Sequence, residues 1–279
     1  MILIADSGSS KTDWLVLLKH QTLPFYSKGL NPVVVSDDFI QHELHDTFSD
    51  NDWTTTINHI YFFGAGCWNE ATCLKVKNQL AVQFPTATIE VASDIEGAVK
   101  ATCGDTAGIT CILGTGSNSC WYDGASIKDQ IPSLGYQLGD EGGGAYLGKQ
   151  LIRHYFYREL PKELHQAFKD NYSISKQIVI QRLYRQEGGN RYLASFAPFL
   201  KEQQQHPFVK KLLKNSFDEF LIRHVSKYPS YQQIPIHFIG SIAFHFQDIL
   251  KERLAAHQLQ LGEIVEKPIL GLERYFRGK

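Results

Sequence analysis

Short apolar runs alternate with amphipathic stretches through the first hundred residues. Runs rich in branched and aromatic residues predict strands at residues 1–5, 14–18, 24–29, 59–66 and 88–93. Apolar positions at helical spacing predict helices at residues 37–48 and 69–83, with a further helix beginning near Asp94. Only small and polar residues separate the first two strands, so these strands should form a hairpin. A β-meander followed by alternating helices and strands indicates an α/β domain with a mixed sheet.

The same design starts again in the middle of the chain. An apolar strand at 108–113 is followed by a small polar loop at 114–119 and a returning strand at 120–124. The two stretches share too few letters to count as a repeat, but their common form suggests two related lobes. The second half is more helical, with predicted helices at 142–160, 206–228 and 242–257, a strand at 234–240 and a short amphipathic end at 268–279.

Composition narrows the class of protein. Of the 279 residues, 43% are hydrophobic and 20% charged, a profile typical of globular proteins. The net charge of −1 argues against a nucleic-acid or acidic-membrane partner, since both normally require a basic face. The opening "MILIADSGSS" has no basic region and meets an aspartate early, unlike a signal peptide. No apolar run approaches the ~20 residues that cross a bilayer. We therefore expect a cytoplasmic protein.

The five cysteines show no metal-binding or redox spacing. They contain no CxxC pair and lie within or beside apolar runs such as "ITCIL" and "SNSCWY". Their spacing favours buried thiols over an iron or zinc site. An odd number also argues against a disulfide framework and indicates a reducing compartment.

The stretch "DSGSSKT" near the N-terminus ends in Lys-Thr, as a Walker phosphate loop does. That loop requires two glycines and leads from a strand into a helix. Here Ala5 and Ser10 occupy the glycine positions, and the following "DWLVLL" favours a strand. The Walker interpretation is therefore rejected.

A hairpin of small residues can still hold phosphate. Gly8 and its neighbouring hydroxyl residues would let the backbone approach oxygen closely, and Asp6 could hold a metal-bound water. The plain alternative is an ordinary Ser/Gly turn capped by Asp6. A second loop of the same type, "GTGSN" at 114–118, favours the phosphate interpretation. Two such hairpins, one in each lobe, could grip a nucleotide from both sides of a cleft.

Four motifs together resemble a known superfamily. "IADSGSSKTD" resembles the first phosphate motif of the actin/hexokinase/Hsp70 (ASKHA) ATPases, "LGTGSNS" their second and "IHFIGSIA" their adenosine motif. "LGDEGGGAYLGK" at 138–149 resembles the Gly-Asp-Glu-Gly-Ser segment of the branch that holds N-acetylglucosamine kinases and BadF/BadG/BcrA/BcrD ATPases. Two departures are Ser7, where the first loop usually has glycine, and Gly143, where serine is common.

The resemblance implies an architecture. It implies an α/β fold of two ribonuclease H-like (actin-like ATPase) lobes with mixed sheets and a nucleotide/sugar cleft between them. The N-terminal lobe would be 1–103, with 265–279 packing back on it, and the C-terminal lobe 104–264. It further implies ATP and Mg²⁺ as cofactors, a small-molecule sugar as substrate and a homodimer.

The resemblance also assigns roles to residues. Asp94 would be the general base for phosphoryl transfer, although it could instead cap a helix, with Ser93 as the other capping candidate. Asp6 would lie on the metal side. Nucleotide contacts are implied for Gly8, Ser9, Ser10, Lys11, Thr12, Thr115, Gly116, Gly240 and Ser241. Lys11 could equally be a solvated turn residue.

Sugar contacts are implied for Asn31, Asn118, Asp140 and Gly144. An Asn-Pro turn explains Asn31 almost as well. Asp140 and Glu141 could simply complement the dipole of the helix that follows them. Buried Asp and Asn side chains suit a neutral sugar, but the sequence shows no amide partner for an N-acetyl group.

Three functions remain in competition. The first is an ATP-dependent kinase of an amino sugar such as N-acetylglucosamine, N-acetylmuramic acid or glucosamine. The second is a BadF-type ATPase that activates a partner through an iron–sulfur cluster, which none of the five cysteines is placed to ligate. The third is a sensor without catalysis, which Asp6 and Asp94 argue against. The kinase is favoured.

Overall fold

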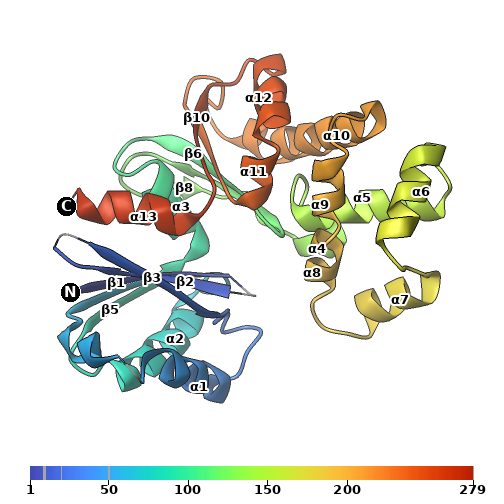
Figure 1. Ribbon diagram of the computed structural model, residues 1–279. Helices are drawn as coiled ribbons and strands as arrows, with labels where there is room; N and C mark the ends of the chain where they lie inside the picture. The colour runs from blue at the N-terminus through green and yellow to red at the C-terminus, as the bar shows by residue number, and fades with distance from the viewer. Residues whose placement is uncertain (9–10, 20, 50, 279) are drawn as a thin grey trace. The chain divides into compact units, whose positions relative to one another are not determined.

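The computed structural model describes residues 1–278 except 9, 10, 20 and 50 (Figure 1). Contacts within the chain divide it into two compact units. Unit 1 comprises Met1–Asp105 with Lys267–Lys279, and unit 2 comprises Thr106–Glu266. Within the described residues, no helix combines the length and the apolar character that crossing a membrane would require.

Unit 1 is built on a five-stranded mixed sheet. Its strands are β1 (Ile2–Ser7), β2 (Lys11–Leu17), β3 (Thr22–Lys28), β4 (His59–Gly64) and β5 (Thr88–Ser93). Their spatial order is β3-β2-β1-β4-β5. The first three strands form the predicted antiparallel meander, whereas β1, β4 and β5 run parallel. The helices of this unit are α1 (Asp37–Phe48), α2 (Glu70–Gln83), α3 (Asp94–Thr102) and α13 (Pro268–Arg277).

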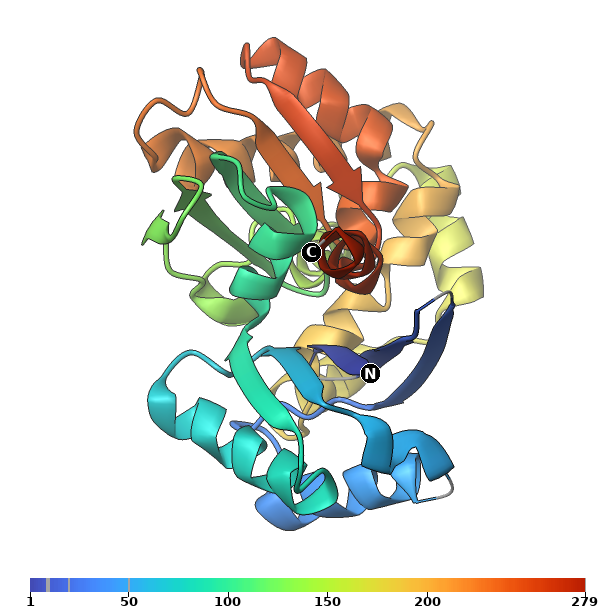
Figure 2. The same ribbon diagram turned by 90° about the vertical axis from the view of Figure 1, so that its left-hand side faces the viewer.

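Alternation along the strands gives this sheet two covered faces. One face carries an aromatic core against α1 and α2, in which Phe48 meets Trp14 at 5.1 Å and Phe84 at 4.9 Å between ring centroids. The other face lies against α3 and α13, where Tyr61 packs on Phe276 at 4.3 Å. Figures 1 and 2 both show α3 and α13 on the side of the sheet opposite α1 and α2. Helix α3 starts directly where β5 ends, so its first residue, Asp94, lies at the edge of the sheet where β5 ends.

Unit 2 repeats the sheet topology. Its strands are β6 (Gly108–Leu113), β7 (Ser117–Tyr122), β8 (Ile127–Asp129), β9 (Ile236–Ile239) and β10 (Leu261–Val265). The order β8-β7-β6-β9-β10 matches that of unit 1, with an antiparallel meander and two strands parallel to its first member. The prediction of two related α/β lobes with mixed sheets is therefore confirmed.

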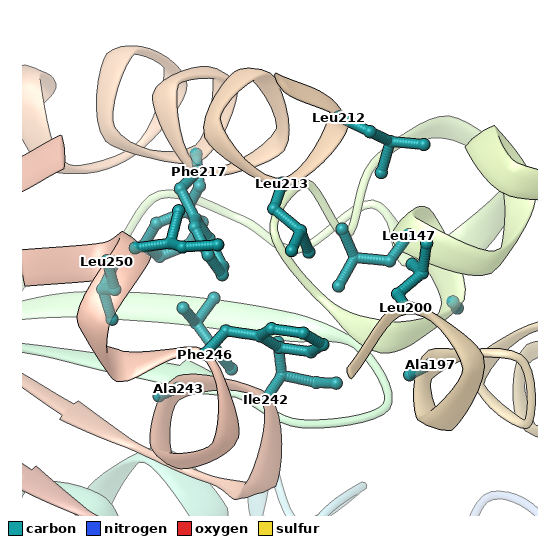
Figure 3. Close-up of a cluster of buried hydrophobic side chains, with 14 of the residues drawn as sticks. Leu147, Ala197, Leu200, Leu212, Leu213, Phe217, Ile242, Ala243, Phe246 and Leu250 are labelled. Carbon is teal, nitrogen blue, oxygen red and sulfur yellow. The ribbon is translucent and has the colours of Figure 1, made fainter. Parts of the chain in front are cut away.

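The helices of unit 2 enclose a large apolar core. They are α4 (Gly135–Leu138), α5 (Gly144–Phe156), α6 (Lys162–Asn171), α7 (Lys176–Tyr184), α8 (Gly189–Ala194), α9 (Ala197–Glu202), α10 (Pro207–Arg223), α11 (Ser241–His245) and α12 (Gln247–Ala256). The helix predicted at 242–257 is divided at Phe246, whose side chain is buried. Figure 3 shows Phe246 packed beside Ile242 and facing Leu213.

Two predicted boundaries are wrong in the same way. The returning strand predicted at 120–124 begins at Ser117, and the strand predicted at 14–18 begins at Lys11. In each case pairing with the preceding strand continues almost to the loop, with Leu113 opposite Ser117 in the second unit. Backbone pairing therefore extends these strands into polar residues that side-chain patterning assigns to a loop.

Gly271 provides a test of how α13 is held on α3. A Cβ at this position would lie 2.4 Å from the carbonyl oxygen of Ala101, so Gly271→Ala must push the two helices apart. We expect a loss of about 1–3 kcal/mol in the free energy of unfolding, measured by denaturant or thermal unfolding. Gly278→Ala is the control because its Cβ would have no neighbour closer than 3.6 Å. Equal stability of the two variants would contradict this packing.

Candidate active site

Three parallel strands of unit 1 end side by side at one edge of the sheet. Ser7 of β1 lies opposite Gly64 of β4, and Gly64 lies opposite Ser93 of β5. Asp6 precedes the end of β1, and Asp94 is the first residue beyond β5. Open α/β sheets bind ligands at the carboxyl ends of their strands. The sheet therefore brings the two predicted acidic residues to the edge where a ligand is expected.

The first turn of α3 decides between two interpretations of Asp94. Ser93 is the N-cap, because its Oγ accepts the Glu96 N–H at 3.4 Å while the Glu96 carboxylate accepts the Ser93 N–H at 3.4 Å. Asp94 Oδ1 accepts the N–H of Ile95 at 2.9 Å. Burial raises the pKa of Asp94 above its ordinary value. Asp94 is thus a half-buried carboxylate that is not needed to cap its helix.

Asp6 is surrounded by other carboxylates. It faces Asp13 across the β1–β2 hairpin, and Asp94 adds further negative charge. Burial, followed by Asp94 and then Asp13, raises the pKa of Asp6 to about 8, while Lys11 lowers it. Lys11 Nζ lies 2.5 Å from Asp13 Oδ1 and therefore compensates one carboxylate of the group. Like charges facing each other across a sheet cost stability, so this arrangement indicates a function that needs negative charge.

A divalent cation fits this chemistry. Among the described residues, no group of three His, Cys, Asp or Glu side chains is arranged to hold a metal by itself. Mg²⁺ in phosphoryl-transfer sites usually takes one or two carboxylates and completes its shell with water and phosphate oxygens. Asp6 supplies such a carboxylate, and a nearby cation would offset the charge that raises its pKa.

The loop between β1 and β2 is a tight hairpin. The Gly8 N–H donates to the Lys11 carbonyl at 2.9 Å. Ser9 and Ser10 lie outside the described residues. The buried Thr12 hydroxyl bonds Ser7 Oγ at 2.8 Å and donates to the Lys28 carbonyl at 3.1 Å. The side chain of Thr12 therefore holds the meander together.

Asn31 forms a turn, and its side chain also contacts Gly66 in the loop that follows β4. Its Oδ1 accepts the Val33 N–H at 3.0 Å, and its carbonyl accepts the Val34 N–H at 3.0 Å, so the turn interpretation is correct for these atoms. Its side chain also lies against Gly66, where a Cβ would stand 2.2 Å from Oδ1. Gly66 also has φ of +85°, so both this backbone conformation and the lack of room for a Cβ favour glycine at this position. The loop after the central strand β4 thus belongs to the site, although the sequence analysis does not include it.

Three segments of unit 2 meet at the matching edge of its sheet. The first is the loop Gly114–Gly116, whose carbonyls accept N–H groups from the start of α5, from Gly144 and Ala145, at 2.8 Å each. The second is the turn 140–144 itself. The third is the turn at Gly240, where φ is +119° and a Cβ would lie 2.4 Å from the Leu113 carbonyl. The structure therefore brings Thr115, Gly116, Gly240 and Ser241, which are predicted nucleotide contacts, close to Gly144, which is a predicted sugar contact.

Asp140 lies at the centre of this edge. Its side chain is buried, and its backbone has φ of +61°, which is rare outside glycine. Oδ1 accepts the Ser133 hydroxyl at 3.0 Å and the Ser117 N–H at 3.3 Å. No described residue donates to Oδ2, which lies 2.8 Å from where a Cβ of Gly116 would stand. Burial raises the pKa of this carboxyl. Asp140 thus has one anchored oxygen and one available to a ligand hydroxyl.

At position 143 there is no room for a side chain, which explains the glycine found there. A Cβ there would lie 2.6 Å from the carbonyl of Gly116. The serine that is common at this position in the branch would therefore displace the loop of Gly116 or the start of α5.

Three polar residues around this edge, Gln130, Ser133 and His224, were not found from the sequence, whereas Asn118 was predicted as a sugar contact. Asn118 lies on β7, where its Oδ1 accepts the Ser119 N–H at 2.9 Å and the Gln130 Nε2 at 3.1 Å. Glu141 does more than complement a helix dipole, because its carboxylate lies 3.5 Å from the buried His224 Nε2. Gln130, Ser133 and His224 carry no local motif, so only long-range contacts could identify them.

Comparisons with known proteins agree with this geometry. No model of a protein family matches the sequence, and no curated protein matches it either. Among solved structures, a candidate N-acetylglucosamine kinase from Porphyromonas gingivalis is 40% identical, with a TM-score of 0.95, covering 100% of this chain and 99% of that one. A second candidate N-acetylglucosamine kinase, from Chromobacterium violaceum, is 17% identical with a TM-score of 0.76, covering 98% of both chains.

A more distant structure shares the fold alone. The ROK family glucokinase from Streptomyces griseus, solved with glucose and AMPPNP, is 11% identical with a TM-score of 0.55, covering 98% of this chain and 97% of that one. The duplicated mixed sheets and this similarity show that the chain has the fold of the actin-like ATPases. At 40% identity over its full length, it belongs to the N-acetylglucosamine kinase branch of the actin/hexokinase/Hsp70 superfamily, and by that membership it is a phosphotransferase.

The charge on Asp6 predicts a cost to stability. Its folded-state pKa of about 8 exceeds the ordinary aspartate pKa of 3.8, so the wild type loses stability as pH rises between these values. Asp6→Asn should remove this loss and raise the midpoint of thermal unfolding at pH 8, without divalent metal, by about 5 °C. The difference should vanish near pH 4. Asp46→Asn on the exposed surface of α1 is the control. A lower midpoint for Asp6→Asn at pH 8 would contradict this account.

Proposed function

We propose that the protein is an ATP-dependent amino-sugar kinase. It would transfer the γ-phosphoryl group to a hydroxyl of N-acetylglucosamine, N-acetylmuramic acid or glucosamine. The observation that carries the proposal is Asp94, a half-buried carboxylate with a raised pKa that is released from helix capping by Ser93. The names of the two N-acetylglucosamine kinase structures support the amino-sugar class.

The proposed reaction is an in-line transfer. The sugar hydroxyl oxygen attacks the γ-phosphorus of ATP, and the bond from that phosphorus to the β–γ bridging oxygen breaks. ADP leaves with the electron pair, and the Asp94 carboxylate takes the hydroxyl proton. A carboxylate with a raised pKa is a stronger base than an ordinary aspartate. Asp6 would hold Mg²⁺ through water, and the ion would supply positive charge at the phosphates.

Unit 2 would supply most of the nucleotide and sugar contacts. Thr115 and Gly116 would contact the β- or γ-phosphate, and Gly240 and Ser241 the adenosine side. The hairpin of unit 1 would add its backbone at 8–12, with Lys11 as a charge beside Asp13. In the sugar site, the open oxygen Oδ2 of Asp140 would accept a hydroxyl. Asn118 and the close approach at Gly144 would add sugar contacts in unit 2, and Asn31 is the proposed sugar contact of unit 1.

The BadF-type activator is disfavoured by the cysteines. Four of the five are buried, and Cys73 is half-buried. Burial raises the pKa of Cys67 to about 12 and also raises that of Cys73. An iron–sulfur cluster is held by thiolates, whereas burial favours the thiol form of Cys67 and Cys73. A homodimeric state and a cytoplasmic location remain part of the proposal.

An ATP-coupled assay over a panel of amino sugars, with and without Mg²⁺, tests the proposed function. We expect ADP release to depend on an amino sugar and on Mg²⁺, and the product to be a sugar phosphate by mass spectrometry. If no sugar raised ADP release above the basal rate, the kinase proposal would fail. A brown, oxygen-sensitive purified protein would favour the activator instead.

Asp94→Asn separates catalysis from binding. We expect kcat to fall by about 10²–10⁴-fold while the dissociation constant for ATP stays within about twofold. In the wild type, kcat should fall with decreasing pH through the raised pKa of Asp94, because the base must be deprotonated. Glu96→Gln keeps a capping side chain two residues away and should retain turnover. Loss of ATP binding in Asp94→Asn would assign Asp94 a structural or nucleotide role.

A further inference from the structure

A tryptophan stands exposed on the loop that crosses the candidate site of unit 1. Trp68 lies between β4 and α2, and 68% of its side chain is exposed. Large aromatic side chains normally bury most of their surface. Such exposure beside a candidate active site needs an explanation that packing does not give.

The location of Trp68 follows from the sheet order. Strand β4 lies between β1, which carries Asp6, and β5, which leads to Asp94. The loop after β4 must therefore leave the sheet between these two residues. Gly66 of this loop lies against the Asn31 side chain. On its other side, Asp94 is close enough to contribute to the raised pKa of Cys67. Trp68 thus follows a segment that runs between a proposed sugar contact and the proposed base.

The backbone at Trp68 is firmly held on both sides. Cys67 is buried, and its N–H donates to the Gly64 carbonyl at 3.1 Å. Asn69 caps α2 by accepting the Thr72 N–H at 2.9 Å, and the Thr72 hydroxyl donates back to the Asn69 carbonyl at 3.1 Å. The indole is therefore presented by an ordered turn, which is what a binding platform requires.

A purely structural role for the indole does not fit. A residue just before a helix cap often packs on the fourth residue of the helix as a hydrophobic staple, which here would pair Trp68 with Cys73. Such a contact would cover the ring, yet most of the ring is exposed. Val33 and Val34, which follow Asn31 in the chain, are exposed as well.

We infer that Trp68 is a specificity-determining residue that stacks on the apolar face of the acceptor sugar. A pyranose ring presents C–H groups on one face and hydroxyl groups around its rim. Asn and Asp side chains can hydrogen-bond the hydroxyl groups around the rim. The C–H groups of the apolar face are best stabilised by packing on the electron-rich face of an aromatic ring. Within unit 1, the proposed sugar contact Asn31 and the proposed base Asp94 are both polar, so Trp68 supplies the missing apolar contact. The inference rests on the proposed kinase function.

Kinetics of three variants with N-acetylglucosamine test this role. Trp68→Ala should raise the KM for the sugar about tenfold, with the KM for ATP within twofold of the wild type. Trp68→Phe keeps an aromatic face and should restore the sugar KM to within about threefold. Tyr184→Ala removes an exposed aromatic side chain from α7 and is the matched control, with no change expected.

Tryptophan fluorescence gives a second measurement that does not need turnover. Addition of N-acetylglucosamine should change the emission of the wild type, and Trp68→Phe should lose most of that change while still binding sugar by calorimetry. An unaltered sugar KM in Trp68→Ala, or an unaltered fluorescence change in Trp68→Phe, would overturn the inference and leave the kinase function standing. A wild type that neither binds nor phosphorylates any sugar of the panel would remove both.

Discussion

Repulsion between carboxylates is the constraint that organises the candidate site of unit 1. Asp6 and Asp13 face each other across a hairpin, and Asp94 begins a helix at the same edge. Carboxylates that face each other on neighbouring strands repel and lower the stability of the sheet, so stability does not explain this arrangement. The arrangement persists because the strands beneath it are fixed by a dense aromatic core and by two helices on the opposite face. Burial elsewhere thus offsets a local cost that a bound cation would relieve.

Unit 2 has the same sheet topology, but the corresponding edge of its sheet is built differently. Its edge carries no comparable set of facing carboxylates among the described residues; instead it relies on close backbone approach. Gly143 leaves room for the Gly116 carbonyl, and Gly240 leaves room for the Leu113 carbonyl. Backbone groups of the loop Gly114–Gly116 are thereby fixed against the start of α5. One sheet topology therefore carries a group of neighbouring carboxylates in one unit and closely packed backbone loops in the other.

The sequence predicts the repeated strand–loop–strand plan and places Asp94 at a helix start, because both depend on local pattern. The choice between Ser93 and Asp94 as cap could also be made locally, since Ser93 and Glu96 have the spacing of a capping box. By contrast, the facing of Asp6 and Asp13 depends on the register of the hairpin. The anchoring of Asp140 by Ser133, and of Asn31 on Gly66, depends on how distant loops meet. These contacts carry no periodicity, so side-chain pattern alone could not reveal them.

The return of α13 to unit 1 has a consequence for synthesis. Unit 2 is continuous in sequence, whereas unit 1 needs residues 267–277 to cover the face of its sheet that α3 leaves open. A chain emerging from the ribosome can complete the fold of unit 2 before it can complete that of unit 1. During that interval Ala101 and Phe63 lack their final cover, since Gly271 and Phe276 have not yet arrived. The unit that is made first is thus the unit that is completed last, when the segment that forms α13 has been added.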